Sequence, residues 1–290
     1  MAGNGEVLVV GADGTIGAAV AARLEAAGVP VIRTSRRVTA DRGAIGRSLP
    51  LDLAALPAAW APPPGITTAV LCAAVTSTDA CRDHPDECRR VNVEATIELG
   101  RRLADVGARV VFLSTNMVFD GSVPFTPAAA ARCPCTVYGR MKAEAEEGLL
   151  ALGDGTTIVR LTKVVGRTLP VIERWRETLS RGEVIRPLAD LVIAPVSLDL
   201  AAAVIAAAAR MPLGHMLQVS ARGDISYAEV ALRLAARWGA APEMIRPVTA
   251  AESEVRLEHV PAHTTLDAAA VRDRLGIEPP DPWAAIDEVA

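Results

Sequence analysis

Long hydrophobic runs and an excess of basic residues are both absent from this sequence. Its most apolar run, Leu200 to Arg210, is far shorter than the roughly 20 residues that a membrane-spanning helix needs. We therefore expect no membrane partner. The first ten residues, MAGNGEVLVV, also lack the basic start and long apolar region of a signal peptide, so the sequence predicts a cytoplasmic protein.

Aromatic residues are scarce as well, at 3% of the 290-residue chain, and the net charge at pH 7 is −4. A nucleic-acid-binding surface needs a basic field and often uses aromatic side chains as platforms for the bases. The composition therefore argues against a nucleic-acid partner. With 51% hydrophobic and 22% charged residues, the chain can build the core of one globular unit or of two closely joined ones.

The cysteines number only five, an odd count that favours reduced thiols over a disulfide framework. Cys81, His84 and Cys88 fall at one-turn spacings that could suit metal ligands. Pro85 interrupts the helix between them, and three ligand types in one segment are a weak signal. We therefore expect no metal site.

What the sequence does contain is an alternation of apolar strand-like segments with helical ones. Such alternation predicts a parallel sheet covered by helices on both faces, which is a doubly wound α/β fold. The expected strands are residues 6–10, 29–35, 67–75, 108–115 and 156–162, and the expected helices are 18–28, 85–106 and 136–150.

Beyond Gly166 the pattern becomes mainly helical, with expected helices at 169–182 and 197–210. Ser226 and Glu229 have the spacing of a capping box that opens a further helix. We expect a dinucleotide-binding domain formed by residues 1–166 together with 194–220, and a smaller, mainly helical C-terminal substrate lobe formed by 167–193 and 221–290.

A glycine-rich loop, GADGTIG, follows the first strand and leads into a helix. Glycines allow a tight turn and let the backbone approach a pyrophosphate, which the amides of the helix N-terminus favour. The alternative is a purely structural turn. The cofactor contacts expected here are Gly11, Gly14, Thr15, Ile16 and Gly17.

The end of the second strand lacks the carboxylate that would bind the adenosine ribose of NAD. Ser35, Arg36 and Arg37 stand there instead. A hydroxyl and two guanidinium groups suit the extra 2′-phosphate of NADP. We therefore expect NADP(H), with NAD(H) as the alternative; the two arginines could also be a solvated strand end.

Tyr138 and Lys142 lie four residues apart in a helical stretch, and this spacing places both on one face. A cation one turn away favours phenolate and should lower the pKa of Tyr138 toward the working range of a proton donor. Thr115 ends the expected strand at 108–115, at the sheet edge where ligands bind, and it is expected to donate a hydrogen bond to the developing oxyanion. Alternatively, Tyr138 and Lys142 are part of an ordinary helix face without a catalytic role.

Taken together, these motifs resemble the extended short-chain dehydrogenase/reductases, and within them the dTDP-4-dehydrorhamnose reductase family of sugar-nucleotide enzymes. The resemblance extends over nearly the whole chain, and its motifs are GADGTIG, the Leu51-Asp52-Leu53 step, CAAV (72–75), RRVNVEAT around Asn92, STNMVFDG (114–121), VYGRMKAEAE (137–146) and TTLDAAAVRDRLGI (264–277).

This resemblance implies a Rossmann-type domain and roles for individual residues. Asp52 and Leu53 would lie against the adenine, Ala73 and Ala74 along the cofactor, and Lys142 on the nicotinamide ribose. Tyr138 would be the proton donor, assisted by Thr115. The small lobe and the Ala194-Pro195-Val196 step would close over a nucleotide-linked sugar, whose expected contacts are Thr76, Asn116, Met117, Val164 and Val165.

Two departures from the family pattern fall where the sugar is expected. The family usually has Asp and Tyr after the catalytic Thr, where this chain has Asn116 and Met117. The family's arginine shortly before the C-terminal Leu-Asp step is also missing from PAHTTLD. The resemblance therefore supports the hydride and proton chemistry better than the identity of the sugar.

The resulting prediction is an oxidoreductase of carbohydrate biosynthesis: an NADP-dependent reductase of a keto-sugar nucleotide. Hydride would pass from NADPH to the carbonyl carbon, and the proton would come from Tyr138. A sugar-nucleotide epimerase of the same superfamily and a non-catalytic regulatory protein that binds NADP or a sugar nucleotide are the alternatives. We expect a monomer or a homodimer.

Overall fold

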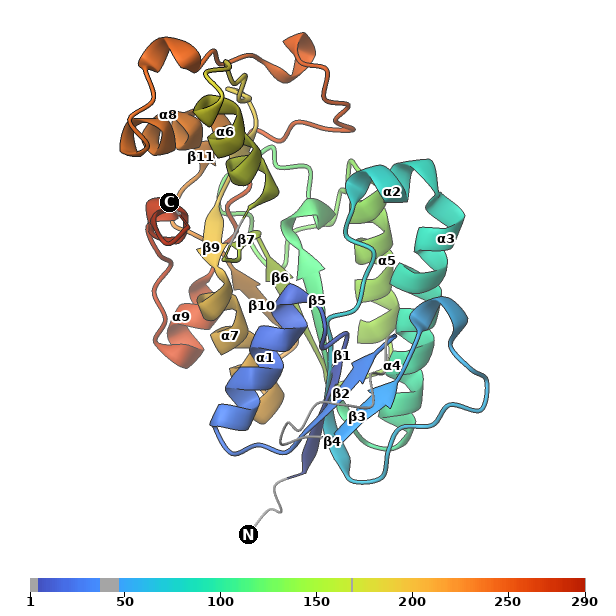
Figure 1. The fold of residues 1–290 in the computed structure, drawn as a ribbon. Helices are drawn as coiled ribbons and strands as arrows, with labels where there is room; N and C mark the ends of the chain where they lie inside the picture. Colours follow the sequence, from blue (N-terminus) through green and yellow to red (C-terminus); the bar gives the residue numbers. More distant parts are fainter. Residues whose placement is uncertain (1–4, 37–46, 168, 290) are drawn as a thin grey trace.

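The computed structural model describes residues 5–36, 47–167 and 169–289. Its centre is a parallel sheet of seven strands in the order β10-β6-β5-β4-β1-β2-β3 (Figure 1). The sheet confirms the doubly wound α/β prediction. Its strands are β1 (Glu6–Val10), β2 (Val31–Ser35), β3 (Arg47–Pro50), β4 (Ile66–Leu71), β5 (Arg109–Thr115), β6 (Thr156–Leu161) and β10 (Met216–Val219).

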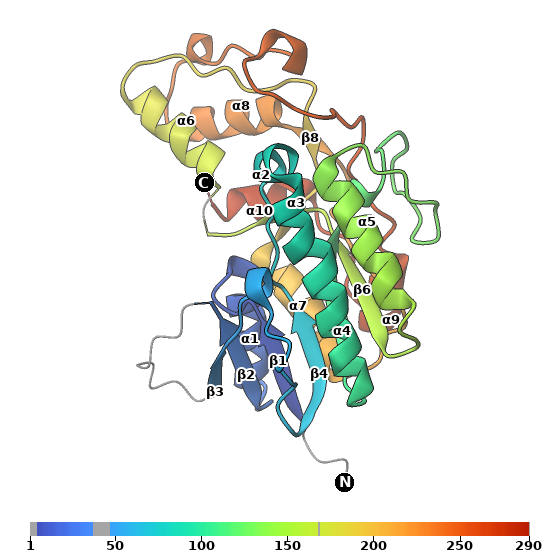
Figure 2. The same ribbon diagram turned by 90° about the vertical axis from the view of Figure 1, so that its right-hand side faces the viewer.

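Helices cover both faces of this sheet. Successive side chains of a central strand point to opposite faces, and both sets are apolar. Val7 and Val9 of β1 join one core with α1 (Thr15–Ala26) and α7 (Leu198–Arg210). Leu8 and Val10 join the other core with α4 (Thr96–Asp105) and α5 (Val137–Leu150). Figure 2 shows α4 and α5 side by side on the face opposite α7.

Helical residues 85–105 are not one regular helix, in contrast to the sequence prediction. α2 (Thr78–Asp83) and α3 (Pro85–Arg89) are followed by a π-helical turn, η2 (Arg90–Ala95), and then by α4. Within the π turn, the buried Asn92 accepts a hydrogen bond from the Val75 amide (2.8 Å) and donates one to the Val75 carbonyl (2.9 Å). This pair of bonds fixes the segment that follows β4, as π turns often do near functional sites.

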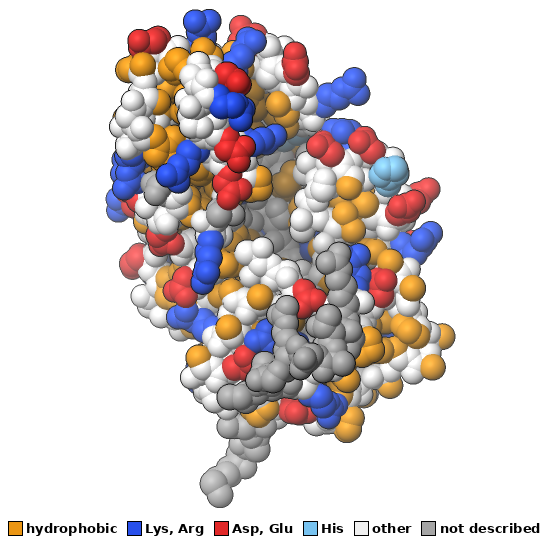
Figure 3. Space-filling model, viewed as in Figure 1, with side chains coloured by type: hydrophobic (Ala, Val, Ile, Leu, Met, Phe, Trp, Pro, Cys, Tyr) orange, Lys and Arg blue, Asp and Glu red, His pale blue; other side chains and the backbone are white. Residues whose placement is uncertain are grey.

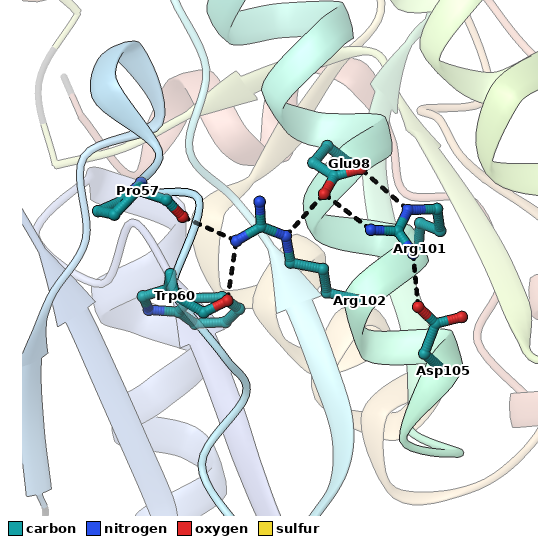
Figure 4. A network of polar contacts seen from close by, with 6 residues as sticks. All are labelled: Pro57, Trp60, Glu98, Arg101, Arg102 and Asp105. Atoms are coloured by element: carbon teal, nitrogen blue, oxygen red, sulfur yellow. Dashed lines mark hydrogen bonds and ion pairs between the residues drawn. The ribbon is translucent and has the colours of Figure 1, made fainter.

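A polar network on α4 fixes the loop after β3 in a similar way (Figure 4). Arg102 donates hydrogen bonds of 2.8 Å to the carbonyl oxygens of both Pro57 and Trp60, and its Nε donates to Glu98 at 2.7 Å. Glu98 also accepts from Arg101, and these two guanidinium groups hold the pKa of Glu98 down at about 2. The loop that begins at the short helix η1 (Leu53–Ala55) is thereby attached to the sheet domain.

The C-terminal part forms a smaller lobe above the carboxyl edge of the sheet (Figure 1). It has its own core, in which Trp175, Leu234 and Ile286 are buried. Ser226 and Glu229 form the predicted capping box at the start of α8. Its elements are α6 (Pro170–Ser180), β8 (Val192–Ile193) paired antiparallel with β11 (Ile225–Ser226), α8 (Tyr227–Arg237), η4 (Pro242–Met244), η5 (Ala250–Glu252) and α10 (Pro282–Asp287).

Three further elements connect the lobe with the sheet domain. β7 (Lys163–Val165) pairs in parallel with β9 (Pro195–Ser197) where the chain leaves and re-enters the sheet domain. α9 (Ala269–Leu275) places Val271 in the core that faces α1 and α7. Part of residues 221–290 therefore packs on the sheet, and the exact boundaries of the two domains stay a prediction.

Candidate active site

Two adjoining clefts open at the carboxyl edge of the sheet. The first, of about 400 Å³, lies above β1, β2 and β4 and brings together most of the residues that the sequence assigned to the cofactor. These residues are Gly11, Gly14, Ser35, Arg36, Asp52, Leu53, Ala73 and Ala74. We refer to this space as the cofactor cleft.

The glycine loop has the backbone geometry that a phosphate cradle requires. Gly11 has φ +81°, and a Cβ atom built there would lie 2.8 Å from the backbone nitrogen of Ala73. A Cβ atom at Gly17 would lie 2.3 Å from the Gly11 oxygen. At Gly14, the N-cap of α1, the nearest atom would be 3.4 Å away and no side chain caps the helix. The first amides of α1 are therefore open to an anion, and the loop fits a pyrophosphate.

At the end of β2, Ser35 and Arg36 line the cofactor cleft, with the side chain of Arg36 exposed. The Ser35 hydroxyl donates a hydrogen bond to Asp13. Asp52 caps η1, its Oδ1 accepting from the amide of Ala54 at 3.0 Å. Arg37, also predicted as a cofactor contact, lies outside the described residues.

Several assignments in this region differ from the prediction. Thr15 and Gly17 do not line the cofactor cleft, since Gly17 faces the Gly11 turn, and Ile16 lines the second cleft instead. Asp13, which lies inside the glycine motif, was missed although the motif itself was the signal. Val91 was missed because nothing in the sequence marks the π turn. The other residues missed here are Leu51, Ala54, Cys72 and Val75.

The second cleft, of about 500 Å³, lies between the sheet domain and the small lobe, and we call it the substrate cleft. Figure 3 shows the molecular surface hollowed in this region, between the small lobe and α2. Thr115 and Tyr138 both line it, so the structure brings the predicted catalytic hydroxyl groups together. The predicted substrate contacts that also line it are Thr76, Asn116, Met117 and Val164.

Tyr138 stands in the first turn of α5, where the chain is fixed by its N-cap. The Thr136 hydroxyl accepts a hydrogen bond from the Gly139 amide at 3.0 Å, as an N-cap threonine does. Tyr138 is 8% exposed, and its hydroxyl has no hydrogen-bond partner among the described residues. Burial raises the pKa of Tyr138. The predicted lowering by Lys142 is therefore wrong for this structure.

Lys142 lies one turn further along α5 and is buried, with 4% of its surface exposed. Its ammonium donates to the Leu113 carbonyl at 2.8 Å and lies 4.3 Å from the ring centroid of Phe112. Burial lowers the pKa of Lys142 to about 8, while the negative charge of Glu146 opposes that shift. Lys142 lines neither cleft, so its predicted contact with the nicotinamide ribose stays a prediction.

Thr115 ends β5, and its side chain is held by the next turn, η3 (Asn116–Val118). The Met117 amide donates to Thr115 Oγ1 at 3.2 Å, and that hydroxyl donates to the Asn116 amide oxygen at 3.4 Å. A hydrogen bond of 3.4 Å is weak. The Thr115 proton can therefore be turned toward a ligand at little cost.

Two predicted walls of the substrate cleft do not line it in this structure, and their contact with a sugar stays a prediction. The side chain of Val165 is 2% exposed and belongs to the core of the small lobe. Ala194 and Val196 are fully buried in the sheet-domain core, and the cleft is lined by Leu191 to Ile193 just before them.

A C-terminal segment that the sequence analysis did not single out forms another wall of the substrate cleft. This segment, residues 256–261, is irregular, and no periodicity marks it. Its members Arg256, Leu257, Glu258, His259 and Pro261 line the cleft. The other lining residues missed by the prediction are Thr78, Arg82, Thr136, Leu161, Thr162, Lys163, Tyr227 and Thr264, together with Ser114, which was noted only as a neighbour of Thr115.

The substrate cleft has a mainly positive lining. Among its described residues, the Lys, Arg, Asp and Glu side chains are the cations Arg82, Lys163 and Arg256 and one carboxylate, Glu258, and Arg82 already pairs with Asp79 and Asp83. Surrounding protein atoms lower the pKa of Lys163 although its side chain reaches the surface. A lining of this charge favours an anionic group such as a diphosphate.

The three residues considered as metal ligands do not face a common point. Cys81 and Cys88 are buried, whereas His84 is exposed. Within the described ranges, no group of three or more His, Cys, Asp or Glu side chains could hold a metal ion. The same part of the chain contains no helix of the length and apolarity needed to cross a membrane.

Comparison with known proteins places this geometry in context. Residues 5–290 match the sequence model of a family described as the RmlD substrate binding domain. A dTDP-4-dehydrorhamnose reductase of Mycobacterium tuberculosis (strain CDC 1551 / Oshkosh) is 31% identical over 193 residues, 62% of each chain. The methionine adenosyltransferase 2 subunit beta of Bos taurus is 31% identical over 109 residues, 38% of this chain and 31% of that protein. Both alignments thus span less than two thirds of the relative's length.

Solved structures agree on the fold. The dTDP-4-dehydrorhamnose reductase of Bacillus anthracis str. Ames in complex with NADP has a TM-score of 0.79 at 18% identity, covering 98% of this chain and 97% of that one. MoeE5 in complex with UDP-glucose and NAD has a TM-score of 0.78 at 22% identity, covering 98% of both chains. At these identities the similarity establishes the shared fold.

Proposed function

The chain belongs to the family of the RmlD substrate binding domain, and from this premise we propose that it is an NADP-dependent reductase of a keto-sugar nucleotide, similar to dTDP-4-dehydrorhamnose reductase. The observation that supports this proposal most is that Thr115 and Tyr138 line one cleft beside an open glycine cradle. Hydride transfer to a carbonyl needs a proton donor and a hydrogen-bond donor at one oxygen. A binding protein has no chemical need for both.

The chemistry divides between the cofactor and the side chains. NADPH, when bound, supplies the hydride. Burial raises the pKa of Tyr138, so its hydroxyl is protonated at neutral pH but is a weaker acid than a free tyrosine. The Tyr138 hydroxyl donates that proton to the carbonyl oxygen of the substrate, and the Thr115 hydroxyl donates a hydrogen bond to the same oxygen as charge develops.

Lys142 assists in this mechanism by position. Its buried ammonium lies on the same helix face as Tyr138, four residues on. Stabilisation of the phenolate by this charge would lower the pKa of Tyr138, but in this structure burial dominates that pKa. The role proposed for Lys142 is therefore contact with the nicotinamide ribose once the cofactor is bound.

The charge of the substrate cleft supports a nucleotide-linked sugar. Lys163 and Arg256 would balance a diphosphate, whereas Arg82 is already paired with Asp79 and Asp83. The relative from Mycobacterium tuberculosis is named for a dTDP-linked substrate, and MoeE5 is bound to UDP-glucose. The cofactor preference for NADP, with NAD as the alternative, rests on Ser35 and Arg36 at the end of β2.

The test is the oxidation of NADPH, followed by its absorbance, with a dTDP-4-keto-6-deoxyhexose generated in the assay and NADH run in parallel. Turnover with a preference for NADPH is the expected result. Tight NADPH binding without reduction of any keto-sugar nucleotide would contradict the proposal. We further propose a cytoplasmic location and a monomeric or homodimeric state. Sedimentation of the purified protein measures the oligomeric state directly.

A regulatory, non-catalytic role is the second candidate. The methionine adenosyltransferase 2 subunit beta of Bos taurus supports it, because its alignment with this chain is as identical as that of the reductase. Asn116 and Met117, which replace the residues usual for the reductases, point in the same direction. A protein of this kind would bind NADPH normally, reduce no keto sugar, and be indifferent to replacement of Tyr138.

A further inference from the structure

Two residues that line the substrate cleft each carry a buried polar atom without a partner among the described residues. The Ser114 hydroxyl and one carboxylate oxygen of Glu258, Oε2, have no hydrogen-bond partner among the described residues. Both residues line the substrate cleft, Ser114 from the carboxyl end of β5 and Glu258 from the C-terminal segment. Buried polar groups are nearly always satisfied in native proteins, and unsatisfied ones indicate a missing ligand or water.

Glu258 is held firmly beside the proposed proton donor. Its other oxygen, Oε1, accepts a hydrogen bond of 2.9 Å from the Val137 amide, the first residue of α5 and the neighbour of Tyr138. This bond leaves Oε2 as the acceptor that remains. The segment around Glu258 is also attached at both sides: Arg82 donates to the Arg256 carbonyl at 3.2 Å, and the His259 ring lies 2.6 Å from the Asp120 carbonyl.

We propose that Glu258 determines substrate specificity by accepting a hydrogen bond from a hydroxyl or amino group that the substrate carries near its reacting carbonyl. This inference rests on the proposed function and narrows its substrate class. A carboxylate acceptor rewards a ligand donor strongly, because hydrogen bonds to charged groups are the stronger ones. It also disfavours a sugar with a carboxylate at that position, since two like charges would be buried together.

Ser114 contributes to the same selection. A hydroxyl can donate or accept, so Ser114 adapts to the ligand while Glu258, as a carboxylate, only accepts. The ligand group that meets Glu258 must therefore be a donor. Neither Ser114 nor Glu258 is needed for the proton transfer itself, which assigns their effect to substrate choice.

The experiment is a double-mutant cycle in which one change is made in the protein and the other in the ligand. Titration calorimetry with NADPH present compares dTDP-glucose with dTDP-hexoses that each lack one hydroxyl and with dTDP-hexoses in which one hydroxyl is replaced by an amino group. The proteins are the wild type, Glu258→Gln and Glu258→Ala. Glu258→Gln keeps an oxygen for the Val137 amide and presents an NH₂ group to the ligand.

In the wild type, loss of one particular hydroxyl, or of the amino group that replaces it, should weaken binding about tenfold or more. In Glu258→Ala the same ligand change should no longer weaken binding, a ratio of about one, because the carboxylate that the ligand group contacts is already absent. A hydroxyl can also accept, so Glu258→Gln should bind a hydroxyl ligand only a few-fold more weakly. An amino ligand should lose about tenfold or more with Glu258→Gln, which separates the two donors.

Glu254→Gln is the matched control, because Glu254 is exposed and lies on the same irregular stretch outside the cleft lining. It should leave every ligand ratio unchanged. Equal ratios for the wild type and Glu258→Ala at every ring position would overturn the role of Glu258 while leaving the proposed function intact. Failure of all dTDP-hexoses to bind the wild type would overturn both.

Discussion

Lys142 donates a hydrogen bond of 2.8 Å from its ammonium to the carbonyl oxygen of Leu113. Leu113 precedes Thr115 by two residues on β5, so this bond joins the helix of the proton donor to the strand that ends in Thr115. The ammonium of Lys142 is therefore a buried cation, held by one carbonyl oxygen and the ring of Phe112. Burial of this kind lowers the pKa of a lysine.

The first prediction concerns the pH dependence of stability. The pKa of Lys142 falls from 10.5 to about 8 on folding. Between these pH values the unfolded chain binds more protons than the folded one, so the contribution of Lys142 to the free energy of unfolding rises with pH across this window. Below about pH 8 the charged Lys142 lowers the free energy of unfolding by its full amount.

We expect the wild type to gain on the order of 3 kcal/mol relative to Lys142→Met between pH 8 and 10.5. Urea unfolding of both proteins at a series of pH values measures this difference. Other titrating groups largely cancel, because both proteins contain them. Parallel pH profiles for the two proteins would show that Lys142 keeps its ordinary pKa.

Replacing Tyr138 by phenylalanine tests the proton donor. The hydroxyl points to no protein partner among the described residues, so its removal leaves no orphaned group and should barely change the melting temperature. The value of kcat should fall by about 10²- to 10⁴-fold, the usual contribution of general acid catalysis. NADPH affinity, followed by fluorescence, should stay nearly constant. A fully active variant would remove Tyr138 from the mechanism.

The glycine loop allows cofactor binding to be separated from folding. A methyl group at Gly14 meets only the Gly11 oxygen, at 3.4 Å, whereas one at Gly17 would lie 2.3 Å from the same atom. Gly14→Ala should therefore melt near the wild-type temperature and bind NADPH at least about tenfold more weakly, because the methyl group blocks the approach of the phosphates.

Gly17→Ala should behave in the opposite way, with a lower melting temperature before any ligand is added. Thermal unfolding with and without NADPH distinguishes the two variants. If Gly14→Ala bound NADPH as tightly as the wild type, the loop would not be the phosphate cradle.

The fold was largely predictable because its signals are local and repeated. β1 and β5 contain continuous apolar runs, β6 contains the pair Ile158 and Val159, and the bounds of all three in the structure differ little from those expected. β3, with the sequence RSLP, and β10 are the two edge strands of the sheet, and they were missed because four residues are too few to show a period. The strand expected at 67–75 ends at Leu71, because the chain leaves the sheet there to line the cofactor cleft.

The site was predictable only where its residues stand close together in the sequence. The glycine loop and the Tyr138 and Lys142 pair each occupy one short segment. Glu258 meets Val137 across 121 residues of chain, and it does so from an irregular segment. Neither a helical nor a strand period marks such a contact, so the wall that faces Tyr138 was visible only in three dimensions.

The preference between the two cofactors should depend on Arg36. Arg36 is exposed at the rim of the cofactor cleft, where a guanidinium can bind a phosphate in two-point contact. We expect Arg36→Ala to raise KM for NADPH at least about tenfold while KM for NADH changes little. Arg47→Ala is the control. Arg47 is exposed at the start of β3, where it pairs in register with Ile32, whereas Arg36 follows the far end of β2. Equal effects on both cofactors would reject a phosphate contact.

The last prediction concerns a buried ion pair behind the active site. Arg160 of β6 donates two hydrogen bonds, of 2.9 and 2.7 Å, to the carboxylate of Glu146 on α5. The two side chains are 1% and 0% exposed. Breaking such a pair leaves a charge without compensation, so Glu146→Gln should lower the free energy of unfolding by about 3–5 kcal/mol.

Asp105→Asn is a suitable control, because the Arg101 to Asp105 pair is exposed and should contribute little. Glu146 also raises the pKa of Lys142. Glu146→Gln should therefore extend the alkaline stability window of Lys142 to lower pH, because the folded pKa falls while the unfolded pKa stays at 10.5, in addition to its effect on stability. Urea unfolding at several pH values measures both effects together. A loss of stability without any movement of that window would mean that Glu146 acts on the fold alone and leaves the charge of Lys142 unaffected.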